Sequence, residues 1–575
     1  MADITLLLGP VRAVRWFLLA IALLASVHFF QRSFSSSNTP SNVVRTSFDW
    51  ASVGPHFPIA SIQSLPTQSR QSLRRVQHVW SKPRRYDVGV GETRCKAVRL
   101  AAEKFWKLHR QQDAGANNQA ALQYATEDPF GPNAATLIDS LDTLWIMKMK
   151  KEFAEAVRII EHFDWSATQR KTINILDTTT RYLGGLLAAY DLSKELVLLT
   201  KAKELGDILY TAFDTPYHMP PITLDLDKAK VGQLEPENNQ PASSITGLSL
   251  EFTHLSQLTG DSKYYDAVAR VITKLEGWQN LTKIIGLWPS YFDVKDDTFN
   301  HDNVFSLGAA SGVTYEYLVK MHAMLGGADE RYELMYHNAS DALIRNLLFK
   351  PMTARQLDIL FPGTFRLGDK VQLDAEIQHL LCFSGGFFML AGKLFNYTEH
   401  LNIGAKLTNG CMWAHTAFPY GLAPDAFSMV PCPGGLLDTC KWDENRWRTH
   451  LEDNHYAGRQ RLPMGFLRAR NPAYSLRPET IESMFVTYRI TGHEEYREAA
   501  WKIFETIQNT TTTDDGFAAI ADVTADSLQH SEFSESYWLS ETLKYFYLLF
   551  SAPETISLDE FVFNTEGHPF RLPKT

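Results

Sequence analysis

The sequence predicts an all-α fold in which helical hairpins close into a ring, preceded by an amino-terminal membrane anchor and a stem. After about residue 90, long apolar stretches alternate with amphipathic ones, and strand-like alternation is scarce. Two segments echo each other: LEFTHLSQLTGDSKYYDAVARVI from Leu250 and SMFVTYRITGHEEYREAAWKIFETI from Ser483. Each indicates an apolar helix, a short TG turn and a second helix with apolar residues three to four apart.

Fainter relatives of this unit occur further along the chain, from residues 139, 181, 313, 382 and 541. They bring the predicted inner helices to seven, each expected to be followed by an outer helix. Such repeats favour a closed ring, in which residues 91–575 form one domain despite their length. The alternative is an open helical scaffold that binds proteins, and chemistry in the loops at one end would distinguish the two.

The composition excludes several classes of protein. Of 575 residues, 45% are hydrophobic and 21% charged, and the 33 Gly and 26 Pro follow no short period. Collagen, low-complexity disorder and a coiled-coil rod are therefore excluded. The 56 Lys and Arg residues against 65 Asp and Glu give a net charge of −9, which offers no field for a polyanion, so no nucleic-acid partner is expected.

The amino terminus contains a candidate membrane segment. Residues 16–31, WFLLAIALLASVHFFQ, are uncharged and follow Arg12 and Arg15. As a helix they span about 24 Å, close to the thinner endoplasmic reticulum bilayer, and the arginines favour a cytoplasmic tail at 1–15. The alternative is a cleaved signal peptide. Either way the rest of the chain enters the secretory lumen, with residues 32–90 as a stem or linker.

Four glycosylation sequons agree with a lumenal location. They begin at Asn280, Asn338, Asn396 and Asn509, all inside the predicted domain at 91–575.

Acidic residues gather at helix ends in the last hundred residues. In SLRPETIES, Glu479 and Glu482 are three apart and share a helix face, while Pro478 suits a first turn and Arg477 stands just ahead. Glu541 begins another, very apolar helix. A carboxylate beside so much apolar surface is costly unless it is hydrogen-bonded, paired or near a metal. Taken singly, each can also be a capping or salt-bridged glutamate at a solvated helix end.

The carboxyl-terminal segment FVFNTEGHPF places Thr565, Glu566 and His568 within four residues. A threonine can offer its hydroxyl and carbonyl oxygens to a hard cation while carboxylates hold the waters of that cation, and oxygen ligands favour calcium. No EF-hand loop is present and no CxxC pair marks a zinc site. Spacing alone therefore does not establish a metal site.

Six motifs in this order resemble the signatures of class I α-1,2-mannosidases, glycoside hydrolase family 47. They are DSLDTLWIM at 139, RYLGGLLAAYDLS at 181, QHLLCFSGG at 378, LRPETIES at 476, SETLKY at 540 and FNTEGHP at 563. The resemblance covers about residues 95–572 and includes the family's type II membrane layout. It implies a monomeric (αα)7 barrel, plugged near its carboxyl end, that binds Ca²⁺ at the base of a pocket and trims terminal α-1,2-mannose from N-glycans with inversion.

The resemblance also implies roles for individual residues. Inversion needs two carboxyl groups about 6.5–9.5 Å apart, one protonating the leaving oxygen and one activating water. Glu479 resembles the water-activating base, and Thr565 the calcium ligand. The residues that match the sugar- and water-contacting wall are Arg181, Glu251, His379, Arg477, Glu482, Tyr537, Glu541 and Glu566.

The five cysteines are too few for a disulfide scaffold. Cys382 and Cys411 match the disulfide of the family, with a pair of buried free thiols as the alternative. Cys95, Cys432 and Cys440 are unassigned, and a local bridge between the last two is an open option.

The acid side of the site departs from the family pattern. Asp177, in LDTTTR, stands where the general acid is usually glutamate. A side chain one methylene shorter withdraws the carboxyl by more than about 1 Å, which can cost on the order of a hundredfold in rate. Gly312 and Ala310, in GAASGVTYEYL, stand where a catalytic aspartate and an arginine are expected. Asp425, in GLAPDAF, replaces a usual glutamate.

Two further features concern the acid side. The family's W-G-x-D-E-L segment is not recognisable before residue 139. Asp296, Asp297 and Asp302 precede Gly312 and can substitute for the missing aspartate only if their loop folds back toward it.

We therefore expect a calcium-dependent, inverting α-1,2-mannosidase of the endoplasmic reticulum or Golgi membrane that acts on high-mannose N-glycans of glycoproteins. Its catalytic residues would be Glu479 as base, Asp177 as acid and Asp425. The altered acid side motivates a rival hypothesis: a mannose-binding or quality-control protein on the same barrel that cleaves slowly or not at all. A glycosidase for another substrate, or a scaffold with vestigial motifs, are the remaining alternatives.

Overall fold

The computed structural model describes residues 43–66, 73–81, 85–113, 123–124, 128–130, 134–168, 170–299, 301–368, 372–453, 461–514, 516–531 and 533–573. The chain divides into two compact units, Met1–Val44 and Arg45–Thr575. The predicted tail and anchor at 1–31 lie outside the described residues. Among the helices that are described, none has both the length and the apolar character needed to cross a membrane.

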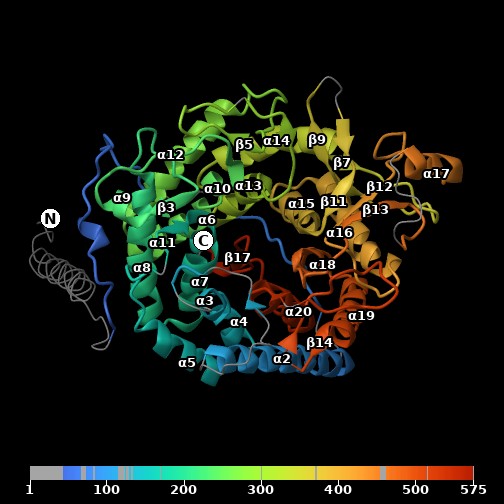
Figure 1. Cartoon of the computed structure of the whole chain (residues 1–575), viewed down its shortest axis with the longest axis horizontal. Helices are drawn as coiled ribbons and strands as arrows, with labels where there is room; N and C mark the ends of the chain where they lie inside the picture. The colour runs from blue at the N-terminus through green and yellow to red at the C-terminus, as the bar shows by residue number, and fades with distance from the viewer. Residues whose placement is uncertain are drawn as a thin grey trace, which may run out of the picture. The chain divides into compact units, whose positions relative to one another are not determined.

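The Arg45–Thr575 unit contains a ring of apolar inner helices (Figure 1). They are α4 (Leu141–Ile146), α7 (Gly184–Ser193), α11 (Ser249–Thr259), α13 (Gly312–Met324), α15 (Ser384–Leu394), α18 (Glu479–Thr491) and α20 (Leu543–Phe550). Each packs against the next, and the turn η5 (Trp538–Thr542) ahead of α20 packs against α4. The ring is therefore closed, which confirms the predicted helical ring and excludes the open scaffold.

Outer helices surround the ring. They are α2 (Arg85–Asp113), α5 (Lys150–Ile160), α8 (Leu196–Tyr210), α12 (Ser262–Trp278), α14 (Arg331–Leu347), α16 (Thr398–Ala417) and α19 (Glu494–Thr511). The prediction that every inner helix is followed by its outer helix was wrong for α20, because the chain turns into a terminal β-hairpin there. The helix that packs on α20 is instead α2, from the beginning of the domain.

The sequence sets the hairpin turns by local chemistry. Gly260 ends α11 with φ +73°, the left-handed conformation that suits glycine at a helix terminus. Asp261 then caps α12, because its carboxylate accepts the backbone N–H of Lys263 at 3.1 Å. The outer helix α12 buries one apolar face, whereas all eight residues of the inner helix α20 are buried.

Short strands and turns join these helices. The antiparallel pairs are β2 (Thr172–Asn174) with β3 (Thr223–Asp225), β4 (Gln240–Pro241) with β5 (Tyr291–Phe292), β7 (Leu348–Phe349) with β8 (Phe361–Pro362), β14 (Thr512–Thr513) with β15 (Gly516–Phe517), and β17 (Phe561–Phe563) with β18 (Pro569–Arg571). Two antiparallel sheets have three strands: β6 (Val304–Phe305), β9 (Thr364–Arg366) and β10 (Gln372–Asp374), and β11 (Glu376–Gln378), β12 (Ala426–Met429) and β13 (Phe466–Asn471). β1 (Gln123–Tyr124) and β16 (Phe533–Ser534) pair in parallel.

The shorter helical elements complete the unit. They are η1 (Trp50–Ser52), α3 (Ala134–Asp139), α6 (Ile175–Asp177), η2 (Thr178–Leu183), η3 (Thr211–Phe213), α9 (Leu226–Lys230), α10 (Ala242–Thr246), η4 (His379–Phe383) and α17 (Glu444–Asp453). Both η2 and η5 are π-helical turns, a rare geometry that is frequent at functional sites.

The β17–β18 hairpin lies inside the ring, where β17 packs against α13 and β18 against α7 (Figure 1). Its tip is a tight turn that Gly567 makes with φ +70°. The hairpin therefore carries residues 564–568, including the predicted calcium ligand, into the interior of the barrel.

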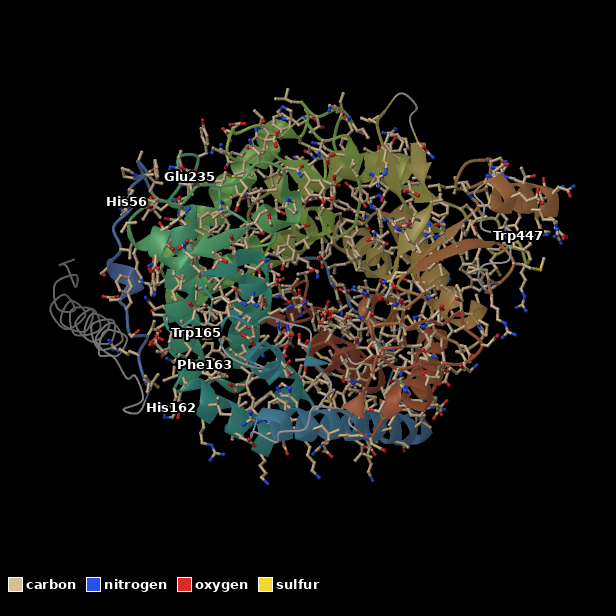
Figure 2. All side chains as sticks on the ribbon, in the orientation of Figure 1. His56, His162, Phe163, Trp165, Glu235 and Trp447 are labelled. Atoms are coloured by element: carbon tan, nitrogen blue, oxygen red, sulfur yellow. A yellow bond between two sulfur atoms is a disulfide. The ribbon has the colours of Figure 1, made fainter. Side chains whose placement is uncertain are left out.

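Residues 45–66 and 73–81, part of the predicted stem, are hydrogen-bonded to the barrel. Asp214 accepts the backbone N–H of His56, which Figure 2 labels, at 2.9 Å, and Asp266 accepts that of Gln63 at 2.7 Å. Asp559 accepts the N–H of Val76 at 2.7 Å. These contacts tie the segment to the domain, and the domain boundary at residue 91 stays a prediction.

The predicted disulfide between Cys382 and Cys411 is present, and Cys432 is bridged to Cys440. Cys95 is free, and burial raises the pKa of its thiol to about 12. The four sequon residues Asn280, Asn338, Asn396 and Asn509 are exposed; their glycosylation stays a prediction.

Candidate active site

Glu479 is the first residue of α18 and lies in a network of basic groups. Its Oε2 is 2.9 Å from His379 Nδ1, and Arg477 Nη1 donates to its Oε1 at 3.3 Å. The turn that leads into the helix is strained, because Leu476 has φ +62°. Burial disfavours the charge, but the hydrogen bond from His379 and the charge of Arg477 outweigh it and lower the pKa of Glu479 to about 2. Glu479 is therefore a carboxylate at neutral pH.

His379 is fixed on its other side as well. Its Nε2 lies 3.1 Å from Thr480 Oγ1 and 3.4 Å from His415 Nε2. The neighbouring His415 is neutral, since burial lowers its pKa to about 3. The imidazole of His379 is thus oriented toward Glu479 by groups from η4, α16 and α18.

Asp425 contacts Ser475 and Arg477, which precede Glu479 in the chain. Its Oδ2 accepts the Ser475 hydroxyl at 2.5 Å, and its Oδ1 is 3.8 Å from Arg477 Nε. Tyr537 donates its hydroxyl to the Ser475 carbonyl at 2.9 Å, and its ring lies under Arg477, 5.7 Å from ring centre to guanidinium. The Asp425 carboxylate is therefore engaged in holding Arg477 and the turn before α18.

Four buried or nearly buried glutamates form an acidic cluster near the hairpin tip. They are Glu251, Glu482, Glu541 and Glu566. Burial raises the pKa of Glu251 to about 7 and that of Glu482 to about 8. Burial and the charge of Glu566 raise the pKa of Glu541, and burial raises that of Glu566. These carboxyl groups therefore stay protonated to higher pH than a free glutamate does.

Hydrogen bonds of Glu251 and an ion pair of Glu566 link the glutamates to the hairpin tip and to η2. Glu251 Oε1 accepts the Asn564 side-chain N–H at 2.8 Å and the Tyr317 hydroxyl at 2.9 Å. Tyr317 also accepts the backbone N–H of Thr565 at 3.3 Å. Arg181, on the π-turn η2, lies 3.0 Å from a Glu566 oxygen.

A hard cation fits these residues. Glu251 Oε2 is buried without a hydrogen-bond partner, and the raised pKa values show carboxylates that another positive charge would stabilise in the ionised form. Within the described ranges, no three His, Cys, Asp or Glu side chains are close enough to chelate a metal directly. A cation here would therefore depend on the oxygens of Thr565 and on waters held by the glutamates.

The residues predicted for the acid side of the site, Asp177 and Gly312, have different surroundings from Glu479. Asp177 ends the single turn α6, where the Asn174 side chain accepts its backbone N–H at 3.0 Å, and its own side chain is exposed. Gly312 begins α13, and a Cβ atom there would lie 2.3 Å from the Leu307 carbonyl oxygen. No space for a side chain exists at this position without a backbone shift.

The aspartates that precede Gly312 are occupied elsewhere. Asp302 accepts the backbone N–H of Tyr291 at 3.1 Å, and Asp296 accepts the Asn238 side-chain N–H at 2.9 Å. Asp297 pairs with Lys274 on α12. These contacts hold all three in loops, so they do not replace the missing aspartate by folding back. Ala310 contributes only its backbone carbonyl, which accepts the N–H of Ser243.

Sequence analysis missed a fully buried network of charges under the site. His568 bridges Asp139 and Asp142, with both distances 3.1 Å, and Lys544 donates to Asp142 at 2.7 Å. Asp139 also accepts the Ser536 hydroxyl at 2.7 Å and lies 3.4 Å from Arg181. A usable signal was present, since charged residues inside very apolar motifs have to be paired.

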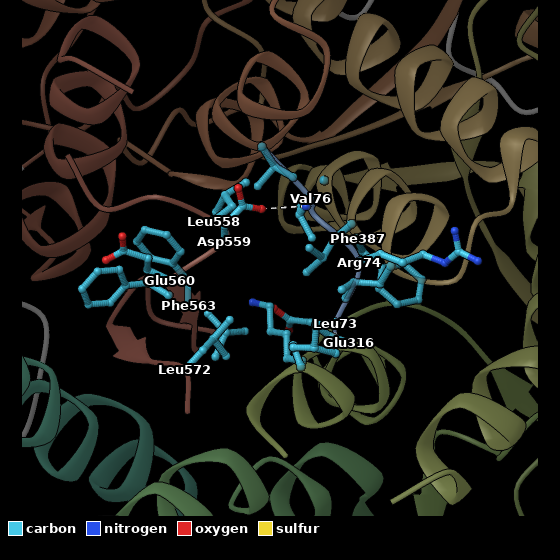
Figure 3. Close-up of a pocket in the computed structure, with 18 of the residues that line it drawn as sticks. Leu73, Arg74, Val76, Glu316, Phe387, Leu558, Asp559, Glu560, Phe563 and Leu572 are labelled. Atoms are coloured by element: carbon cyan, nitrogen blue, oxygen red, sulfur yellow. Dashed lines mark hydrogen bonds and ion pairs between the residues drawn. The ribbon is translucent and has the colours of Figure 1, made fainter. Parts of the chain in front are cut away.

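A separate cavity of about 700 Å³ borders the acidic cluster. It is lined by Glu316, Lys320 and Glu482 together with apolar side chains such as Phe387 and Phe563, and by Leu73–Val76 (Figure 3). Glu479, Arg477, Asp177 and Arg181 are not among the residues that line it. The largest of the cavities described is therefore distinct from the predicted catalytic residues.

Comparisons with known proteins agree with the family resemblance of the sequence motifs. The family model described as Glycosyl hydrolase family 47 matches residues 101–572. The chain is 31% identical over 475 residues to the human endoplasmic reticulum mannosyl-oligosaccharide 1,2-alpha-mannosidase, covering 81% of this chain and 62% of that protein. It is 30% identical to the probable mannosyl-oligosaccharide alpha-1,2-mannosidase 1B of Aspergillus niger, covering 84% of this chain and 92% of the relative. The solved alpha-1,2-mannosidase from Trichoderma reesei superposes with a TM-score of 0.72 at 26% identity, covering 84% of this chain and 99% of that one.

Proposed function

The chain belongs to glycosyl hydrolase family 47, and we propose that it removes terminal α-1,2-linked mannose from high-mannose N-glycans by calcium-dependent, inverting hydrolysis. The chain spans under two thirds of the human relative's length, so activity and substrate are proposals for this protein. We place the reaction in the endoplasmic reticulum or Golgi lumen, as the predicted anchor and the name of the human relative suggest.

The observation that carries the proposal is the environment of Glu479. A general base has to be ionised and oriented, and His379 and Arg477 do both. In the proposed step, Glu479 takes a proton from a water whose oxygen attacks C1 of the mannose. The C1–oxygen bond to the leaving sugar breaks on the opposite face, which inverts the configuration at C1.

The leaving oxygen needs a proton, and we assign it to Asp177. This carboxyl is exposed beside the start of η2, the turn that carries Arg181. It donates directly or through one water, which would compensate for a side chain one methylene shorter than glutamate. In this proposal Arg181 and Glu566 would contact the sugar in the cleaved position, and Tyr537 would pack against it.

The Thr565 hydroxyl and carbonyl oxygens would hold calcium, with Glu251, Glu482, Glu541 and Glu566 holding its waters. Bound calcium would supply coordination of mannose hydroxyl groups at the base of the site. The contribution of the chain itself is the fixed tip of β17–β18, which Asn564 and His568 anchor to the surrounding helices.

The rival function, mannose binding with slow or no turnover, is favoured by one observation. The Leu307 carbonyl oxygen is 2.3 Å from the position that a Cβ of residue 312 would take, so one expected catalytic carboxyl is absent and a side chain there would need the backbone to shift. Binding groups on the base side are unaffected by this change.

The deciding experiment is release of mannose from a high-mannose N-glycan by the full-length chain, with calcium and with chelator. Glu479→Gln should abolish release while leaving the fold and calcium-induced stabilisation intact. Asp177→Asn should lower kcat, and Asp177→Glu should raise it by up to about a hundredfold. Unchanged release by Glu479→Gln would remove this residue from the mechanism. Absence of release by folded, calcium-stabilised wild-type protein that binds mannose would establish the rival.

A further inference from the structure

A second hollow lies outside the candidate active site, on the edge of the barrel beside α17. It has a volume of about 590 Å³ and is formed by the loop that the Cys432–Cys440 disulfide closes and by the residues that lead into α17, up to Arg446. We call it the α17 hollow. Figure 1 shows α17 projecting from the ring, and Figure 2 shows Trp447 at this outer edge.

A disulfide and hydrogen bonds hold the loop that forms the walls of the α17 hollow. The disulfide closes the loop, inside which Asp438 accepts the backbone N–H of Gly435 at 2.6 Å. Lys350 donates to the Asp438 carbonyl at 3.0 Å and so ties the loop to the barrel. A rigid hollow loses little conformational entropy when it binds.

Packing also fixes Trp442, the aromatic side chain that lines the hollow. Trp442 and Trp447 pack on a small buried cluster that includes Met352, Val430 and Leu467, with the two indole rings 5.6 Å apart. Trp447 donates its indole N–H to the Phe466 carbonyl at 3.0 Å. Trp442 lines the hollow and is only partly buried.

Polar groups with unused hydrogen-bonding capacity surround Trp442. The Nε of Arg446 is buried without a partner, and the exposed Asn445 side chain has no hydrogen bond to any residue that the structure describes. Asp443 uses one carboxylate oxygen to cap α17 by accepting the N–H of Arg446 at 3.0 Å. Its second oxygen has no hydrogen bond to any of the described residues.

We propose that the α17 hollow binds a terminal hexose of an oligosaccharide. A hexose offers an apolar C–H face that packs on an indole ring, and adjacent hydroxyl groups that pair with planar amide, carboxylate and guanidinium groups. Acidic and basic side chains are mixed around the hollow, which argues against an anion site. The hollow is small and polar-rimmed, which argues against an apolar peptide.

A short stretch of chain connects the α17 hollow to Asp425, one of the predicted catalytic residues. Strand β12 (Ala426–Met429) begins directly after Asp425, and Cys432 follows Asp425 by seven residues, so the two lie at most about 25 Å apart. A branched glycan has several terminal sugars at such separations. That the bound sugar is mannose of a high-mannose glycan rests on the proposed function; that the hollow binds a sugar does not.

Titration of the full-length chain carrying Glu479→Gln, which should not consume the sugars, with α-1,2-mannobiose and with a soluble high-mannose oligosaccharide tests the proposal, with tryptophan fluorescence and calorimetry as readouts. Trp442→Ala and Asn445→Ala should each weaken oligosaccharide binding, the first by about tenfold or more. Thr449→Ala is the matched control, because Thr449 is an exposed polar residue on α17 that does not line the hollow. It should leave binding unchanged.

Hydrolysis separates this inference from the proposed function. Turnover of mannobiose should be equal in wild type and Asn445→Ala, while KM for an intact glycoprotein rises in the variant. If wild type hydrolyses nothing but Trp442→Ala and Asn445→Ala still lose sugar binding, the inference stands and the proposed function fails. Sugar binding that is unchanged in folded Asn445→Ala and Trp442→Ala would overturn the inference. So would equal, Trp442-dependent capture of the same glycoprotein after its glycans are removed, because the hollow would then recognise polypeptide.

Discussion

Glu251 provides a direct test of the charge balance at the acidic cluster. The residue is fully buried on α11, with Oε1 bonded to Asn564 and Tyr317 and with Oε2 unpartnered. Glu251→Gln keeps an acceptor for Asn564 and Tyr317 and removes the ionisable group. The substitution therefore isolates the electrostatic contribution of one carboxylate.

The expected magnitude follows from the pKa. Burial raises the pKa of Glu251 from 4.5 to about 7, which corresponds to about 3 kcal/mol between the two protonation states. Since the folded pKa lies above the unfolded value, the folded protein holds a proton between pH 4.5 and 7 that the unfolded chain has lost. Without calcium, stability should therefore fall with rising pH across this window and become level above it.

The assay is thermal unfolding of wild type and Glu251→Gln at pH 5 and pH 8, with chelator and with calcium. In chelator, wild type should lose about 3 kcal/mol more than the variant on going from pH 5 to pH 8, seen as a larger fall in melting temperature. Calcium should restore wild type at pH 8 more than it restores the variant. An equal fall with pH in both proteins would show that Glu251 is not the strained carboxylate described here, and the argument for a cation at this cluster would lose its support.

Three further predictions follow from local geometry. Gly312→Ala should lower the melting temperature, because its Cβ would lie 2.3 Å from a backbone carbonyl oxygen and relieving such a contact costs about 1–3 kcal/mol; Gly277→Ala, in open space on α12, should raise it slightly. His379→Ala removes the hydrogen bond that lowers the pKa of Glu479, so the acid limb of the kcat/KM profile should move to higher pH; an unmoved limb would separate the two residues. Opening the Cys382 disulfide, which closes 29 residues, should cost about 1 kcal/mol more than opening the other, which closes 8, as chemical unfolding of single-disulfide variants would measure.

The sequence predicted the ring because the inner helices are buried on all sides. Segments such as Leu543–Phe550 are apolar apart from Lys544, so their burial could be inferred without knowing their partners. The role of α2 could not be predicted in this way, since its contact with α20 joins opposite ends of the domain. Strands of two or three residues are too short to give an alternation signal, and the π-turns η2 and η5 carry none.

Within the site, the motifs indicated the residues but not their contacts. His379 and Glu479 are separated by 100 residues, and only the closed ring places them together. The spacing of Glu479 and Glu482 predicted a shared helix face, but not that their pKa values shift in opposite directions. His379 and Arg477 keep Glu479 ionised, whereas burial raises the pKa of Glu482 to about 8 and the charge of Lys320 does not offset it.

The acid side shows why a missing residue cannot be judged by identity alone. The family motif presents position 312 as an aspartate that has been lost. The Leu307 carbonyl oxygen instead lies only 2.3 Å from the position of the first side-chain atom, so an aspartate here would have to move the backbone at the start of α13 before it could reach a substrate. Asp177 has no such obstacle, because its side chain is exposed. We therefore assign proton donation to the Asp177 carboxyl, and lengthening Asp177 is a cleaner test of catalysis than rebuilding position 312.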